Sequence, residues 1–327
     1  MSFDEVWGQA PAVQTIERAL ASGRVHHAYR FEGPPGVGKE MLAFRLARAL
    51  VCEREPLGCG ACSACHRALT LSDEEPRVPL HPDVVLVGRG LYRAVTGQAE
   101  ALGIGIEQIR RVVLARVGFS PHEGRALVFI VCDADELTVQ AANALLKTLE
   151  EPPARTHFVL LTSRPHRLLD TIRSRTLPVR FGPLPQAVIE RILSERGLDP
   201  GAAALAEGSA ELALLLSSPD SVREREEFVA AAEAALAAPD LAPTLRFAES
   251  QKGDRDTIKQ RLAFFAHALA ARARAGVRDG APGAERWAEC HAQALAAITD
   301  LERNVQPALV LESMLIRMRS LSTGSFR

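Results

Sequence analysis

The residues from Gly33 to Lys39 have the types and spacing of a phosphate-binding loop. They read Gly-Pro-Pro-Gly-Val-Gly-Lys, follow a short apolar run and precede a helical pattern. Glycines such as Gly36 and Gly38 let backbone N–H groups close around phosphate oxygens, and the N-terminus of the next helix adds a favourable dipole. Lys39 would then reach the β- and γ-phosphates of a nucleotide. The alternative is a glycine-rich turn that binds nothing. It would not explain why the loop lies between a strand and a helix and ends in a lysine.

Acidic residues accompany this loop at two places in the sequence. Glu40 stands where such a loop normally has a serine or threonine whose hydroxyl binds Mg²⁺. Asp133 follows a continuous apolar run, which places it at the carboxyl end of a strand and within reach of that Mg²⁺. Asp135 and Glu136 come just after it, and we interpret them as acidic residues at a helix start, where capping and the helix dipole favour them.

Four cysteines lie close together with the spacing of a metal site. The pattern is Cys52-x6-Cys59-x2-Cys62-x2-Cys65. Four thiolates complete the tetrahedral shell of Zn²⁺ and leave no open position, so we predict a structural zinc ion. An iron–sulfur cluster and reduced cysteines without metal are the alternatives. A DNA-binding zinc finger is the weakest interpretation, because residues 57–64 contain no basic side chain and the histidines of classical fingers are missing.

The first 180 or so residues alternate short apolar runs with helical patterns, which is typical of a parallel α/β sheet. The runs predict strands at 29–32, 83–87, 127–131 and 158–162. The helical patterns predict helices at 13–22, 40–51, 106–115 and 139–150.

The remaining sequence is alanine-rich and helical in pattern. We divide the chain into an α/β domain at 1–183, a small helical domain at 184–240 and a second helical domain at 241–327. The last helix is expected to bury one apolar face, made by Val310, Leu311, Met314, Leu315 and Met318.

Composition and charge limit the classes of function. An apolar content of 47% with 24% charged residues is typical of a globular protein, and a formal net charge of −1 argues against nucleic-acid contact as the sole activity. The sequence has neither an apolar run of transmembrane length nor the N-terminal pattern of a signal peptide. We therefore expect no membrane contact and a cytoplasmic protein, in which clustered cysteines indicate metal before disulfides.

Several segments together resemble a known family. Residues 137–153 closely resemble the segment after the Walker B strand in bacterial clamp-loader subunits of the AAA+ superfamily. Residues 163–165, followed by 172–175, resemble the sensor 1 and SRC regions of these proteins. The resemblance is dense over 1–185 and is strongest to the delta-prime class. It implies an AAA+ P-loop domain with an inserted zinc module, then a helical lid domain and an all-α collar domain.

The resemblance also implies roles for individual residues. Arg175 corresponds to the arginine finger, which acts in trans on ATP bound by a neighbouring subunit, and its planar, permanently charged group suits that task. The alternative for Arg175 is a surface or packing arginine. Ser163, with Thr162 beside it, occupies the sensor 1 position facing the γ-phosphate. The nucleotide-binding set implied for this chain is Gly33, Gly36, Gly38, Lys39, Asp133 and Ser163.

Three departures from the family pattern weaken the expected ATPase site. Glu40 replaces the Mg²⁺-binding hydroxyl, Ala134 replaces the glutamate that polarises water, and Glu211 replaces the sensor 2 arginine. Together they indicate a subunit that holds ATP or ADP without hydrolysing it, or holds neither.

The expected function is that of a non-hydrolysing stator in a clamp loader of DNA polymerase III. Its partners would be the tau/gamma motor subunits and the delta subunit, with the sliding clamp and primer–template DNA reached through the assembled complex. The alternative is an ATP-hydrolysing motor subunit of the tau/gamma type, which intact Gly38, Lys39 and Asp133 favour.

Overall fold

The structure, a computed structural model, describes residues 3–92, 103–198, 200–251, 255–280, 283–303 and 305–323. It divides into two compact units, Met1–Leu214 and Leu215–Arg327, and each is described by itself. The division of the sequence into three domains stays a prediction.

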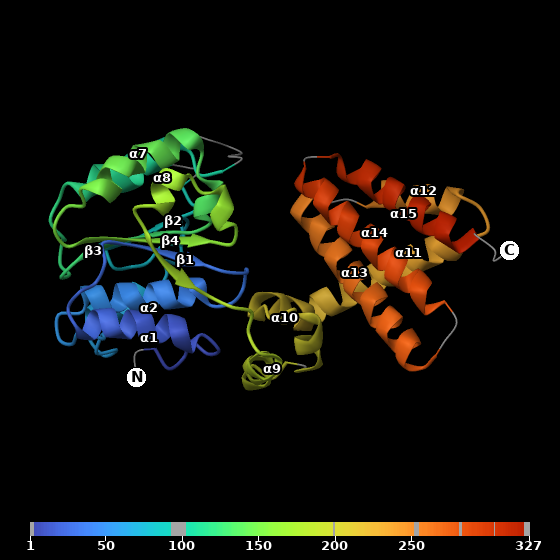
Figure 1. Cartoon of the computed structure of the whole chain (residues 1–327), viewed down its shortest axis with the longest axis horizontal. Helices are drawn as coiled ribbons and strands as arrows, with labels where there is room; N and C mark the ends of the chain where they lie inside the picture. The colour runs from blue at the N-terminus through green and yellow to red at the C-terminus, as the bar shows by residue number, and fades with distance from the viewer. Residues whose placement is uncertain are drawn as a thin grey trace. The chain divides into compact units, whose positions relative to one another are not determined.

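A five-stranded parallel sheet forms the centre of the first unit (Figure 1). The order across the sheet is β2-β3-β4-β1-β5. The strands are β1 (Ala28–Glu32), β2 (Val84–Val87), β3 (Leu127–Val131), β4 (Thr156–Thr162) and β5 (Leu177–Arg180). A parallel α/β sheet is therefore confirmed, and four of its strands lie where the apolar runs predict them.

Helices cover both faces of this sheet (Figure 1). On one face lie α1 (Ala10–Ala21) and α2 (Lys39–Val51), and on the other lie α7 (Val139–Glu150) and α8 (Asp170–Arg173). Every residue of β3 is buried, because a central parallel strand packs against helices on both sides. Phe129 and Phe158 stack in the core with ring centroids 5.0 Å apart.

The fifth strand, β5, is absent from the prediction. It has an edge position and exposes Leu177, Pro178 and Arg180, so it has no continuous apolar run to reveal it. Proline is tolerated in such a position because an edge strand has N–H groups that face solvent.

The predicted helix at 106–115 is present but irregular. It forms as α5 (Ile106–Gln108), a π-helical segment η1 (Ile109–Leu114) and α6 (Ala115–Val117). The other short elements of the first unit are α3 (Ser63–Leu69), η2 (Ala134–Glu136), η3 (Pro165–Arg167), α9 (Gln186–Glu195) and η4 (Pro200–Leu205), and α10 (Ala210–Ser217) crosses into the second unit.

The second unit consists of helices. They are α11 (Pro219–Ala237), α12 (Ala242–Ser250), α13 (Arg255–Arg278), α14 (Ala284–Glu302) and α15 (Pro307–Thr323). The predicted apolar face of the last helix is confirmed, because all five of its residues are buried in the core of this unit: Val310, Leu311, Met314, Leu315 and Met318. Among the described residues, no helix has both the length and the apolar character needed to cross a membrane.

A buried carboxylate, Asp83, holds the loop before β3. Its two oxygens accept backbone N–H groups of His122 at 2.5 Å, Glu123 at 2.9 Å and Gly124 at 2.7 Å. Burial opposes ionisation of Asp83, but the three N–H donors outweigh it and lower the pKa of this carboxyl. The ionised form of Asp83 is therefore part of the folded state.

We expect Asp83→Asn to lower the free energy of unfolding by about 1.5–3 kcal/mol at pH 7, because charged hydrogen bonds are lost. Since the pKa in the folded state lies below the unfolded value of about 3.9, this stabilisation is present above that pH. It is lost as the pH falls through the folded-state pKa. Urea unfolding from pH 7 to pH 3 measures the effect, with the exposed Asp73→Asn as control. A difference between wild type and Asp83→Asn that does not shrink in acid would contradict this account.

Candidate functional site

The phosphate-binding loop lies at the carboxyl edge of the sheet. In the strand register, Glu32 pairs with Thr162, so the residues after β1 and β4 emerge side by side. The N–H of Gly33 donates to the carbonyl of Thr162 at 3.2 Å and joins the two ends. Open parallel sheets bind their ligands at this edge.

Lys39 begins α2 and turns its amino group back over the loop. Its Nζ donates to the carbonyls of Gly33 at 2.7 Å and Pro34 at 2.5 Å, and to Ser163 Oγ at 3.3 Å. Ser163 thus lies beside the lysine. Burial lowers the pKa of Lys39, while nearby carboxylates oppose that change.

The start of α10 packs directly against the loop. The N–H of Ala210 donates to the carbonyl of Gly36 at 2.9 Å. A Cβ on Gly36 would lie 2.2 Å from Ser209 Oγ and 2.6 Å from Glu211 Cβ, and the φ angle of +69° is one that favours glycine. Glycine is therefore required at Gly36 both by its conformation and by this close approach.

Carboxylates outnumber the lysine at this site. A cavity of about 230 Å³ is lined by Lys39 together with Glu40, Asp133 and Glu211. Burial, followed by repulsion from the other two carboxylates, raises the pKa of Glu40. Burial and the neighbouring Asp135 raise the pKa of Asp133, and Lys39 offsets only part of this. Such a site disfavours additional negative charge unless a cation enters with it.

Asp135 and Glu136 lie at the start of a helical element, as predicted, but this element is a short 3₁₀ helix and they do not cap α7. They lie in the 3₁₀ turn η2, and the N-cap of α7 is Thr138. Asp135 instead accepts Thr162 Oγ1 at 2.6 Å and Arg164 Nε at 2.8 Å, and only 2% of its side chain is exposed.

These contacts determine how the residues after Asp133 can act. The hydroxyl of Thr162 is engaged by Asp135, which leaves Ser163 as the polar side chain on the phosphate-loop side. Hydrogen bonds from Thr162 and Arg164 outweigh burial and lower the pKa of Asp135. Ala134 is buried and has no group that could orient water.

A second cavity, of about 570 Å³, also adjoins the loop. Its wall includes Gly36 and Gly38 of the loop, Trp7 and Val6 from the N-terminal segment, and residues of α9 and α10. Arg191 lies over the ring of Trp7, 4.1 Å from its centroid. A polar phosphate cavity beside a larger, mostly apolar one is a combination that a nucleotide would match.

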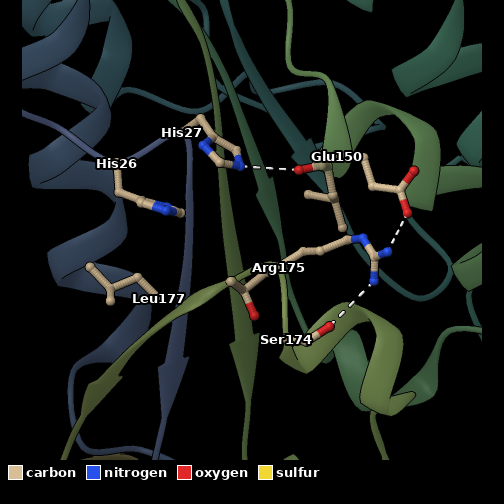
Figure 2. A pocket seen from close by; sticks show the side chains of 8 residues that line it. His26, His27, Glu150, Ser174, Arg175 and Leu177 are labelled. Carbon is tan, nitrogen blue, oxygen red and sulfur yellow. Dashed lines mark hydrogen bonds and ion pairs between the residues drawn. The ribbon is translucent and has the colours of Figure 1, made fainter.

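Arg175 lies outside the phosphate-loop site, between α8 and β5. It lines a third cavity, of about 610 Å³, with His26, His27, Glu150 and Ser174 (Figure 2). Figure 2 shows its guanidinium turned toward Glu150, with which Nη2 forms an ion pair. Sequence reasoning singled out Arg175 but missed this partner, which is 25 positions away in the chain. The available signal was a pair of adjacent carboxylates at the end of a helix.

The four predicted cysteines come together in space. Their sulfur atoms all lie within 4.8 Å of one another, with Sγ–Sγ distances of 4.0 Å for Cys52–Cys62 and 3.9 Å for Cys59–Cys65. A tetrahedral shell with Zn–S bonds of about 2.3 Å needs sulfur atoms roughly 3.8 Å apart. The donor set and its spacing therefore fit Zn²⁺.

Backbone N–H groups donate hydrogen bonds to two of these sulfur atoms, which favours the thiolate form that binds a metal. The N–H groups of Cys59 and Cys65 point at Cys52 Sγ and Cys62 Sγ, at 3.3 and 3.4 Å. Burial raises the pKa of the Cys52 thiol, but backbone N–H donors outweigh it and bring the value to about 6. Arg125 joins the module to α2 by donating to the carbonyls of Ala49 at 3.1 Å and Glu55 at 3.4 Å.

These features define a P-loop α/β fold with a four-cysteine module inserted after α2. A family model described as "DNA polymerase III, delta subunit" matches residues 8–185, which is more than half of the chain. The chain belongs to this family, and the expected resemblance to the delta-prime class is confirmed.

Individual relatives agree with this assignment. The chain is 34% identical over 224 residues to the DNA polymerase III subunit delta' of Escherichia coli, covering 66% of this chain and 62% of that protein. It is 34% identical over 199 residues to subunit delta' of Bacillus subtilis, covering 60% and 54%. It is also 36% identical over 203 residues to subunit gamma/tau of Mycobacterium tuberculosis, covering 60% and 32%. The matches thus span from 32% to 62% of the length of these relatives.

A crystal structure of a DNA polymerase III gamma subunit-related protein from Thermotoga maritima also aligns with the chain. The alignment covers 93% of this chain and 98% of that chain, with a TM-score of 0.43 and 17% identity.

Proposed function

We propose that this chain is a non-hydrolysing stator subunit of a clamp loader, of the delta-prime class in the AAA+ superfamily. It presents Arg175 to ATP bound by a neighbouring subunit. The observation that carries the proposal is the position of this arginine, which is partly exposed at the rim of a cavity and separate from the chain's own phosphate loop.

The chain's own phosphate loop supports the non-hydrolysing part of the proposal. Three carboxylates surround Lys39, and the position after Asp133 is the buried Ala134. The nearest alternative base, Asp135, is bound to Thr162 and Arg164. If ATP or ADP enters the site, Lys39 and Ser163 would contact it. No side chain in the described part of this site would then orient an attacking water.

The remaining parts of the proposal concern partners and structure. By analogy with its relatives, the chain would assemble with tau/gamma motor subunits and a delta subunit within DNA polymerase III, in the cytoplasm. The sliding clamp and primer–template DNA would be met through the assembled complex. A helical lid at 184–240 and a helical collar at 241–327 would serve this assembly. Zn²⁺ bound by Cys52, Cys59, Cys62 and Cys65 would stabilise the inserted module and supply no reaction chemistry.

Steady-state, Mg²⁺-dependent ATP hydrolysis by the purified chain tests the stator role. We expect no turnover above background, with or without primed DNA, because Ala134 offers no carboxylate to orient water. Lys39→Ala is the control for a contaminating ATPase. Turnover that disappears in Lys39→Ala would contradict the proposal and identify the chain as a motor.

The second candidate function is that motor role, an ATP-hydrolysing subunit of the tau/gamma type. It is favoured by the intact contact between Lys39 and Ser163 and by the position of Asp133 in the same cavity. The gamma/tau relatives are as similar in sequence as the delta' relatives. The hydrolysis experiment above distinguishes the two functions.

A further inference from the structure

Glu150 occupies a position that helix stability does not explain. It is the last residue of α7, where the unpaired carbonyls form the negative end of the helix dipole and a carboxylate is unfavourable. A second carboxylate, Glu151, follows immediately. The role of Glu150 is therefore sought in its side-chain contact and not in the stability of α7.

Its contact is the guanidinium of Arg175, which also has two other acceptors in its own chain (Figure 2). Nη1 donates to the carbonyl of Thr171 at 2.9 Å and to Ser174 Oγ at 3.3 Å, while Nη2 forms the ion pair with Glu150. To turn its whole planar fork toward a phosphate elsewhere, Arg175 must give up at least one of these acceptors. Glu150 is the acceptor with a net charge, and it is the one that an approaching anion repels.

The backbone that carries Glu150 is held in place. His27 Nε2 lies 3.1 Å from the carbonyl of Leu149, and Figure 2 shows this contact beside the ion pair. A carbonyl only accepts hydrogen bonds, so His27 Nε2 is the donor in this contact. The end of α7 is thus joined to the residues before β1, and the contact with Arg175 can change by side-chain rotation alone.

We propose that Glu150 is a positioning residue that holds Arg175 against its own chain and limits its access to the nucleotide of a neighbouring subunit. This inference rests on the proposed trans role of Arg175. The exposed fractions of the two side chains, 32% for Arg175 and 47% for Glu150, make the ion pair weak enough for exchange. An incoming triphosphate attracts the guanidinium and repels the carboxylate, so the same charge drives both halves of the exchange.

The free chain allows a first test that needs no partner. Phenylglyoxal modifies accessible arginines, and mass spectrometry follows the peptide that contains Arg175. We expect Glu150→Gln to raise the modification rate about two- to fivefold, the range that a partly exposed ion pair allows. The matched control is Glu151→Gln, which removes the neighbouring exposed carboxylate and should leave the rate unchanged. Equal rates in wild type and Glu150→Gln would overturn the proposal.

The second test uses the clamp loader reconstituted with tau/gamma and delta subunits of the same organism. Single-turnover ATP hydrolysis without primed DNA should be about two- to fivefold faster with Glu150→Gln, and this gain should vanish in an Arg175→Ala background. If Arg175→Ala slows hydrolysis but Glu150→Gln equals wild type, the holding role is overturned and the trans role stands. If Arg175→Ala has no effect, both are overturned, whatever the modification rates show.

Discussion

If Arg175 acts in trans as proposed, Arg175→Ala is expected to lower ATP hydrolysis at the neighbouring subunit's site by about 10³-fold or more, the range seen when an arginine finger is removed. The reason is that a planar guanidinium stabilises the charge that develops on the transferred phosphoryl group. Single-turnover hydrolysis by the reconstituted, DNA-stimulated complex measures this step apart from product release. Arg175→Lys should recover little, because a lysine has the charge but not the planar fork.

Arg173→Ala is the matched control for this prediction. Arg173 lies two positions earlier, on α8, and its side chain pairs with Asp170 at 2.9 Å on the surface. Its removal should leave hydrolysis within about twofold, as expected for an exposed ion pair. Co-elution of the subunits in size-exclusion chromatography shows whether either variant still assembles. An assembled Arg175→Ala complex with wild-type turnover would remove the trans role.

Loss of one cysteine ligand is expected to destabilise the four-cysteine module strongly. We expect Cys65→Ser to abolish binding of one zinc ion per chain and to unfold the module formed by residues 52–65, because metal binding supplies the folding energy of such small modules. The affinity of structural zinc sites corresponds to about 10–16 kcal/mol, most of which depends on all four thiolates. Elemental analysis of protein purified without chelators measures the metal, and limited proteolysis followed by mass spectrometry locates the unfolding.

Cys290→Ser serves as the control, because Cys290 is buried in the core of the second unit. It should lower stability modestly and keep one zinc ion per chain. Wild-type protein without zinc, or Cys65→Ser with a full equivalent, would contradict the metal assignment.

The parts of the fold that follow from local patterns could be predicted from the sequence. β3 is recognisable because each of its residues is buried and apolar. The cysteine ligands are close in sequence, so their spacing alone predicts that they meet. β5 could not be predicted, because the pairing of Val179 with Phe31 holds it in the sheet while its own composition argues against a strand.

The same distinction applies to the candidate site. Lys39 and Ser163 follow from motifs, and the structure brings them together. The partners of Asp135 and Arg175 do not, because Arg164 and Glu150 reach them from elements distant in sequence. Charge alone suggests many pairings for each of these arginines. The parallel sheet selects one of them by fixing where each connecting loop emerges.

The composition of β5 also affects how the chain behaves before it meets a partner. An exposed sheet edge can add a strand from another molecule and start aggregation. Here the outer strand includes Pro178, which has no N–H to offer, and ends in Arg180, whose charge resists close stacking. This edge of the sheet is therefore a poor template for a strand from another molecule.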